Sequence, residues 1–270
     1  MSVREIVFQV VCFRFYYFLL CTTILKKYEG EMRRKLTVRF VSMTHALFSG
    51  TLSLITLFVF PQFLTNPANS YNEFAYHVII FSVSYFCHDL TDMLIHGEGV
   101  KYVEYILHHL FMLAAFAMVL VWPHLIPVAI VGLLTEINTV FIHVRLILKF
   151  YGYSNDSSQF RLNQLLNLST FLPARQLPAV WVGWFSIFER SPLVPILARL
   201  VFMAGVLFVT VHNYRIFVRL LKVEGFIGLK SAKSVAHLRR AENDDLINMY
   251  DDESEQLQAG SDAVQTDKFY

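Results

Sequence analysis

Long, nearly uninterrupted apolar runs constrain the fold of this chain more than any other feature of its sequence. We recognise seven of them, at about residues 5–25, 37–60, 73–95, 104–122, 125–149, 163–187 and 193–221. A helix needs about 20 apolar residues to cross a hydrocarbon layer about 30 Å thick. Lipid satisfies no backbone hydrogen bonds, so spanning segments must be helices or closed barrels. The sequence therefore predicts an all-α, polytopic transmembrane helix bundle of about seven spans.

The composition agrees with a membrane protein. The chain is 55% hydrophobic and only 16% charged, whereas a soluble domain has about 25% charged residues. A net charge of +2 does not indicate a nucleic acid as partner. The three cysteines, Cys12, Cys21 and Cys87, fall inside apolar runs without paired spacing. We expect buried thiols there, and neither disulfides nor a zinc site.

Two of the runs are irregular. The first contains Gln9 and Arg14, but it lacks the charge order and the cleavage site of a signal peptide, so we expect an uncleaved span. The sixth contains Pro173 and Pro178 on either side of Arg175. Proline is tolerated in a span when neighbouring helices satisfy the freed carbonyls, and the pattern predicts a kinked or broken helix.

Lysine and arginine in the connections predict the orientation. The connection between the first two runs and the segment after the last run are rich in basic residues, whereas residues 61–72 contain none. Basic and non-basic connections continue to alternate along the chain. Because basic connections stay in the cytoplasm, we expect the N-terminus outside and the C-terminus inside.

We expect three regions along the chain: an N-terminal span with a basic loop at residues 1–35, the remaining spans at residues 36–222, and a cytoplasmic tail at residues 223–270. From about residue 241 the tail is acidic and polar. Such a segment cannot bury enough apolar surface to offset its ordering entropy, so we expect disorder there.

Ionisable residues inside the runs gather toward the predicted cytoplasmic side. Their insertion is costly, so they normally face a partner or a cavity. At about 1.5 Å of rise per residue, four of them share a shallow depth: Asp89, Asp92, His108 and His109. Glu136 and Arg175 each lie near the middle of a run. We predict that these two pair, because either alone would be an uncompensated charge in hydrocarbon.

Three interpretations of this cluster compete. The polar groups can join helices by hydrogen bonds. They can form a pocket for a lipid head group, with or without acyl-transfer chemistry, since an imidazole beside carboxylates suits a general base or an acyl carrier. A di-iron site is the third interpretation. It would require many paired histidines, and the chain has one adjacent pair, His108 and His109, so we expect no metal and no cofactor.

Three segments resemble a known family. The segments are residues 85–94, with Asp-x-x-Asp-Met-Leu, residues 104–109, which end in His-His, and residues 134–145, with Glu-x-Asn-x-Val-Phe-x-His-x-Arg. Together they resemble the TLC domain, a family that includes the ceramide synthases, over roughly residues 36–222. The first and third segments are most similar to the subgroup of TLC domain-containing proteins 1 and 2.

The resemblance implies an intramembrane histidine pair at His108 and His109. Ceramide synthases also carry His-Asp-x-x-Asp after that pair. Here this motif precedes the pair, and the later positions read Thr135-Glu136-Ile-Asn-Thr139. Ceramide synthesis is therefore not the function that we expect.

The nearer subgroup implies a different role. Its members resemble regulators that limit long polyunsaturated acyl chains in phospholipids and so reduce membrane fluidity. We expect such a regulator at the plasma membrane, with membrane lipids (phospholipids or acyl-CoA) as partners. The alternative is a lipid acyltransferase that uses the histidine pair, and the endoplasmic reticulum is the alternative location.

Overall fold

The computed structural model describes residues 2–96 and 103–223, and within these ranges the chain is helical without strands. The main helices are α1 (Ser2–Thr22), α2 (Gly30–Val59), α4 (Glu73–Ile95), α5 (Val103–Val121), α6 (Ile126–Leu133), α7 (Thr135–Phe150), α8 (Ser158–Phe171), α9 (Leu177–Phe188) and α10 (Ile196–Val223). Short elements connect them: α3 (Gln62–Thr65), η1 (Pro67–Asn69), η2 (Pro123–Leu125) and η3 (Leu172–Gln176). The predicted tail lies outside the described residues, except for Val223.

The predicted all-α bundle is confirmed, and the helices coincide with the apolar runs. In the part of the chain that the structure describes, five helical stretches are long and apolar enough to cross a membrane: Val3–Thr22, Gly30–Val59, Glu73–Ile95, Pro123–Phe150 and Ile196–Lys222. A shorter apolar helix covers Ile106–Val121. The run at residues 163–187 is shared among α8, η3 and α9. The chain is a multi-pass membrane protein; the total of seven spans and their orientation stay predictions.

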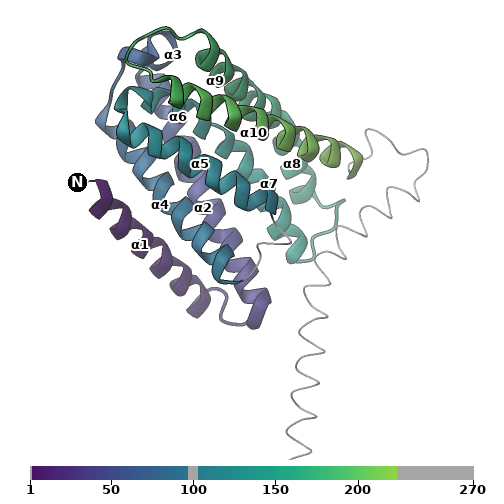
Figure 1. The fold of residues 1–270 in the computed structure, drawn as a ribbon. Helices are drawn as coiled ribbons and strands as arrows, with labels where there is room; N and C mark the ends of the chain where they lie inside the picture. Colours follow the sequence, from purple (N-terminus) through teal and green to yellow (C-terminus); the bar gives the residue numbers. More distant parts are fainter. Residues whose placement is uncertain (1, 97–102, 224–270) are drawn as a thin grey trace, which may run out of the picture.

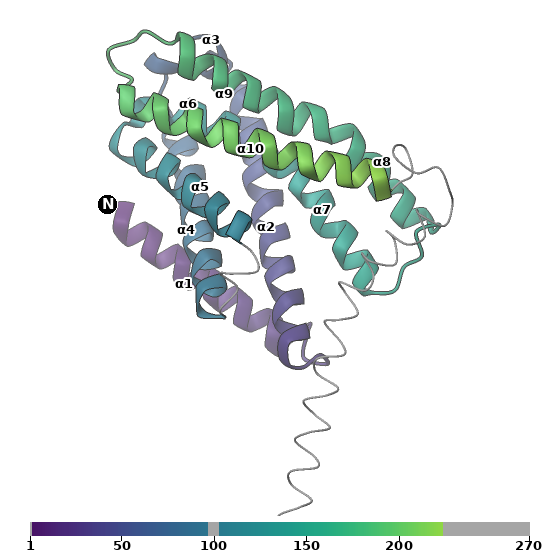
Figure 2. The same ribbon diagram turned by 45° about the vertical axis from the view of Figure 1, so that its right-hand side comes forward.

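The long helix α2 runs through the bundle and packs against α4, α6 and α7. Helix α1 lies at one edge of the bundle beside α4 (Figures 1 and 2). Helix α10 packs against α5 and α9 and forms another face. Large apolar side chains on the outer face of α1, including Phe8, Phe15 and Phe18, are exposed, whereas Phe13 is buried. This division is expected of a helix with one face toward lipid and one toward protein.

Local sequence signals explain several helix ends. The Asn72 side chain accepts a hydrogen bond from the Ala75 backbone N–H at the start of α4, and Ser157 does the same for Phe160 at the start of α8. Such side chains satisfy backbone donors that have no partner inside the helix. Helix α7 ends before Gly152, whose φ of 74° is a conformation that glycine adopts without strain.

The predicted irregularity around Arg175 is a π-helical turn, not a break. The chain stays helical from Ser158 to Phe188, and η3 connects α8 to α9. Pro173 and Pro178 lack the N–H groups that an α-helical ladder would require. A π-helical turn is a known way to accommodate such an interruption and is frequent at functional sites. Here it carries Arg175 into the bundle, where that residue is buried.

Helices α2 and α7 approach each other closely at Gly50. A Cβ atom at this position would lie 2.9 Å from the Ile137 backbone nitrogen. In lipid the hydrophobic effect does not drive helices together. Membrane helices therefore often associate through small residues that let their backbones pack closely. Gly50 thus sets the distance between the two helices that carry much of the cavity described below.

Candidate functional site

A cavity with a volume of about 420 Å³ lies inside the bundle, among α2, α4, α5, α6, α7, α9 and α10. All six site candidates predicted from the sequence line it: Asp89, Asp92, His108, His109, Glu136 and Arg175. They come from four elements, α4, α5, α7 and η3. The fold therefore gathers in one place polar residues that the sequence distributes over several spans.

The cavity changes from polar to apolar along the bundle. Near the start of α2 it is lined by three basic residues, Arg34, Lys35 and Arg39. Toward the opposite end of the helices it is lined by apolar side chains, among them Phe116 and Phe202. Ligand pockets are mostly apolar, with a few polar groups that fix orientation. This lining suits an elongated molecule with one polar end and one apolar end.

The two histidines of the adjacent pair contact different helices. His109 Nε2 lies 2.8 Å from Asp89 Oδ2, and both residues are buried. The ring of His108 stacks on that of His212 from α10, with centroids 6.2 Å apart. Consecutive residues on a helix point in directions about 100° apart, so the pair reaches α4 and α10 at once. A carboxylate bonded to one ring nitrogen orients an imidazole and selects its tautomer.

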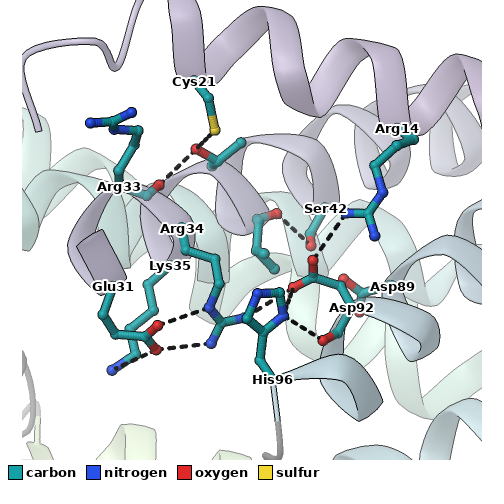
Figure 3. A network of polar contacts seen from close by, with 12 residues as sticks. Arg14, Cys21, Glu31, Arg33, Arg34, Lys35, Ser42, Asp89, Asp92 and His96 are labelled. Carbon is teal, nitrogen blue, oxygen red and sulfur yellow. Dashed lines mark hydrogen bonds and ion pairs between the residues drawn. The ribbon is translucent and has the colours of Figure 1, made fainter. Parts of the chain in front are cut away.

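Asp92 does not accompany Asp89 beside the histidines. It forms ion pairs with Arg34 at 2.9 Å and with Arg14 at 3.2 Å (Figure 3). Arg34 donates two further hydrogen bonds of 2.9 Å to Glu31. The side chain of Asp92 is only 2% exposed, so these arginines compensate a fully buried charge. The predicted shallow group thus consists of one aspartate near the histidine pair and one held by arginines.

Arg175 is held by polar side chains from two helices. Its guanidinium donates to Asn138 Oδ1 (2.6 Å) and Thr139 Oγ1 (2.9 Å) on α7, and to Asn213 Oδ1 (2.9 Å) on α10. Asn138 in turn donates to Asn167 Oδ1 on α8 at 2.9 Å. Glu136 lines the same cavity and interacts electrostatically with Arg175. A direct contact between the two stays a prediction.

Three polar atoms in the cavity wall are buried without a hydrogen-bond partner among the described residues. They are Nδ1 of His108, Nδ1 of His143 and Nδ2 of Asn213. A buried polar group without a partner costs about 1–3 kcal/mol. These atoms are therefore available to a polar group of a bound molecule. Within residues 2–96 and 103–223, no cluster of three histidine, cysteine or acidic side chains is arranged to bind a metal ion.

Several residues that complete the site are not evident from the sequence. In the sequence, Arg14 only interrupts an apolar run, and Arg34 only adds to the basic residues that predict a cytoplasmic connection. Asn138 and Asn213 are amides within apolar stretches, which is a signal for both, and Asn138 also lies in the segment at residues 134–145 that resembles a known family. Their partners depend on how the helices are rotated against one another, and sequence periodicity does not specify that rotation.

Comparison with known proteins agrees with this geometry. TLC domain-containing protein 2 of Danio rerio is 26% identical over 203 residues, which cover 75% of this chain and 81% of that protein. TLC domain-containing protein 2 of Mus musculus is 32% identical over 148 residues, or 54% of this chain and 47% of that protein. TLC domain-containing protein 1 of Homo sapiens is 26% identical over 54% of this chain and 58% of its own length. The chain thus matches about half of the length of the last two.

No solved structure is significantly similar to the chain. The model of the TLC domain family, in contrast, matches residues 35–222. That range contains nearly every residue that lines the cavity, from Lys35 on α2 to Ile216 on α10. The chain therefore belongs to the TLC domain family.

Proposed function

We propose that this protein binds a membrane lipid in its cavity and regulates the acyl composition of phospholipids. In this proposal it limits long polyunsaturated chains and so keeps the membrane less fluid. The observation that carries the proposal is the polar-to-apolar lining of a cavity inside a membrane bundle. A water-soluble substrate would not fill the apolar half of the cavity. A purely apolar ligand would leave the buried polar groups without hydrogen bonds.

The charges at the polar end favour an anionic head group. Arg34, Lys35 and Arg39 lie together in the lining there, and arginine and lysine are the side chains that bind phosphate and carboxylate groups. Phospholipids and acyl-CoA both present such groups next to apolar chains. These two are therefore the ligands that we propose, at the plasma membrane or, as the alternative, in the endoplasmic reticulum.

The test of this function is quantitative lipid analysis of cells with and without the protein, under a load of polyunsaturated fatty acid. We expect the loss of the protein to raise polyunsaturated phosphatidylethanolamine selectively. Imaging of the tagged full chain in the same cells decides between the two membranes. A change confined to ceramides would overturn the proposal and indicate ceramide-synthase chemistry instead.

A lipid acyltransferase is the second candidate, and the His109–Asp89 contact of 2.8 Å favours it. An imidazole oriented by a carboxylate can take a proton from an attacking hydroxyl or amine, or carry an acyl group itself. His108 lies beside it with a buried Nδ1 atom that has no partner within the described residues. In such a reaction the hydroxyl or amine of one lipid attacks the acyl carbonyl carbon of another or of acyl-CoA. The new ester or amide bond forms as the donor's ester or thioester bond breaks, and the leaving alcohol or thiol receives the proton that the imidazole took.

Single variants distinguish the two candidates. If the protein is an acyltransferase, His108→Ala or His109→Ala leaves the chain folded in the membrane but abolishes its effect on phospholipid acyl chains. If the protein acts without turnover, at least one of these variants retains most of the effect. The amount of folded protein in the membrane is the control for both measurements.

A further inference from the structure

Glycines within the described membrane helices differ in the space around them, and Gly183 is intermediate, with Val206 Cγ1 at 3.6 Å from an added Cβ atom. Gly50 is explained by packing, since an added Cβ atom would come within 2.9 Å of the backbone of α7. Gly132 on α6 and Gly205 on α10 are different, because an added Cβ atom at either position meets no atom within 4 Å. The absence of a side chain there does not serve close contact between helices, which is the usual role of glycine in membrane bundles.

Backbone conformation does not explain these two glycines either. Among the described glycines only Gly30 and Gly152 have positive φ. Gly132 and Gly205 lie within helices, where glycine is less favourable than alanine. What they share is their position: both line the cavity, on two different helices. The space that they leave open is space inside the cavity.

Their depth places this space beyond the polar groups. Gly132 lies four residues before Glu136, about 6 Å farther along the bundle, and Gly205 lies eight residues before Asn213, about 12 Å farther. Alanines also line the cavity, namely Ala115, Ala129 and Ala179, among larger apolar side chains such as Met112 and Val206. The open space at Gly132 and Gly205 widens the cavity where the part of an acyl chain next to the head group would lie, and Phe202, about one turn before Gly205, lines it farther on.

We propose that Gly132 and Gly205 determine which acyl chains the cavity accepts, by leaving room for a chain bent by cis double bonds. A saturated chain is straight and narrow and needs no such width, whereas each cis double bond displaces the chain sideways. Larger side chains at the two positions would remove the width and leave the polar end unchanged. This inference rests on the proposed lipid-binding function and names its ligand as a polyunsaturated acyl chain with a polar head.

The test uses the purified full chain and two probes. These are lysophosphatidylethanolamines with chains of equal length, one saturated and one polyunsaturated, offered together, with the bound ratio measured by native mass spectrometry. We expect the wild-type protein to bind the polyunsaturated probe preferentially. In Gly132→Leu and Gly205→Leu the ratio of polyunsaturated to saturated probe falls toward one.

The matched control is Ala204→Leu. Ala204 is the neighbour of Gly205 but is exposed and is not among the residues that line the cavity. The same leucine there should leave the ratio unchanged. If a leucine variant does not fold, Gly132→Ala and Gly205→Ala replace it. Their added methyl groups meet no atom within 4 Å, and a smaller fall in the ratio is expected.

Two results would overturn the inference: equal binding of both probes by the wild-type protein, or an unchanged ratio in the folded glycine variants. Failure of the proposed function gives a different result. In that case the glycine variants shift the binding ratio as expected, but loss of the protein leaves the phospholipids of loaded cells unchanged.

Discussion

Asp92 is a buried carboxylate that forms ion pairs with two arginines far from it in the sequence. Arg34 and Arg14 contact its two oxygens separately, at 2.9 and 3.2 Å. Arg34 also has Glu31 as a second anionic partner. Removing one member of a buried ion pair leaves the other without compensation, and this costs more than the pair itself contributes.

We therefore predict that Asp92→Asn lowers the free energy of unfolding by about 3 kcal/mol, at the low end for a broken buried pair because Arg34 keeps its bonds to Glu31. The measurement is denaturant unfolding of the purified protein in detergent. Asp156→Asn is the matched control, since the Asp156–Arg161 pair at 3.0 Å is exposed on both sides and should contribute little. Equal effects of the two variants would contradict this prediction.

Arg175 gives a second prediction, because its planar guanidinium reaches three acceptors on two helices at once. Lysine keeps the charge but cannot reproduce that geometry. Arg175→Lys should lower the free energy of unfolding by about 2 kcal/mol, the value of one hydrogen bond to a charged group. Arg190→Lys, at an exposed position, should change it little under the same conditions. A fully stable Arg175→Lys protein would show that the three hydrogen bonds are dispensable.

At the scale of elements, the close approach of α2 and α7 is the contact most sensitive to volume. Gly50→Ala would place a methyl group 2.9 Å from the Ile137 nitrogen, and such overpacking costs about 1–3 kcal/mol. At Gly183 the nearest atom to an added Cβ is Val206 Cγ1 at 3.6 Å, which is ordinary contact. Thermal unfolding should therefore show a lower Tm for Gly50→Ala and an equal or higher Tm for Gly183→Ala. The reverse order would mean that the helices can separate without cost.

The helices themselves could be predicted, because each apolar run has the length that a membrane demands. The detailed backbone conformation of the run at residues 163–187 could not be predicted. Its two prolines predict an irregular helix, but they do not specify a π-helical turn. The choice depends on Arg175 reaching Asn138 and Asn213, and therefore on how α7 and α10 are placed around it.

At the scale of the whole molecule, orientation in the membrane stays a prediction from the basic connections. We test it with single cysteines at two exposed positions, Asn69 and Ser154, in a chain whose three native cysteines are alanine. A membrane-impermeant thiol reagent should label Asn69→Cys on intact cells and Ser154→Cys only after permeabilisation. The chain without added cysteine gives the background. Labelling of Ser154→Cys on intact cells would reverse the orientation.

The sequence also predicts which ionisable residues lie together in the bundle. All six predicted residues line one cavity, because ionisable side chains within spans must turn toward a shared polar interior. Their partners were not predictable in the same way. Asp89 and Asp92 lie one helical turn apart, yet Asp89 contacts His109, whereas Asp92 contacts Arg14, Arg34 and its own helix neighbour His96.

The ion pair between Arg14 and Asp92 also has a consequence for biosynthesis. The two residues are 78 positions apart, so the ribosome completes α1 and α2 before it makes the carboxylate that neutralises Arg14. Until α4 enters the bilayer, α1 carries an arginine whose insertion into lipid is unfavourable. Helix α1 therefore depends on a helix that is synthesised later for a stable position in the membrane.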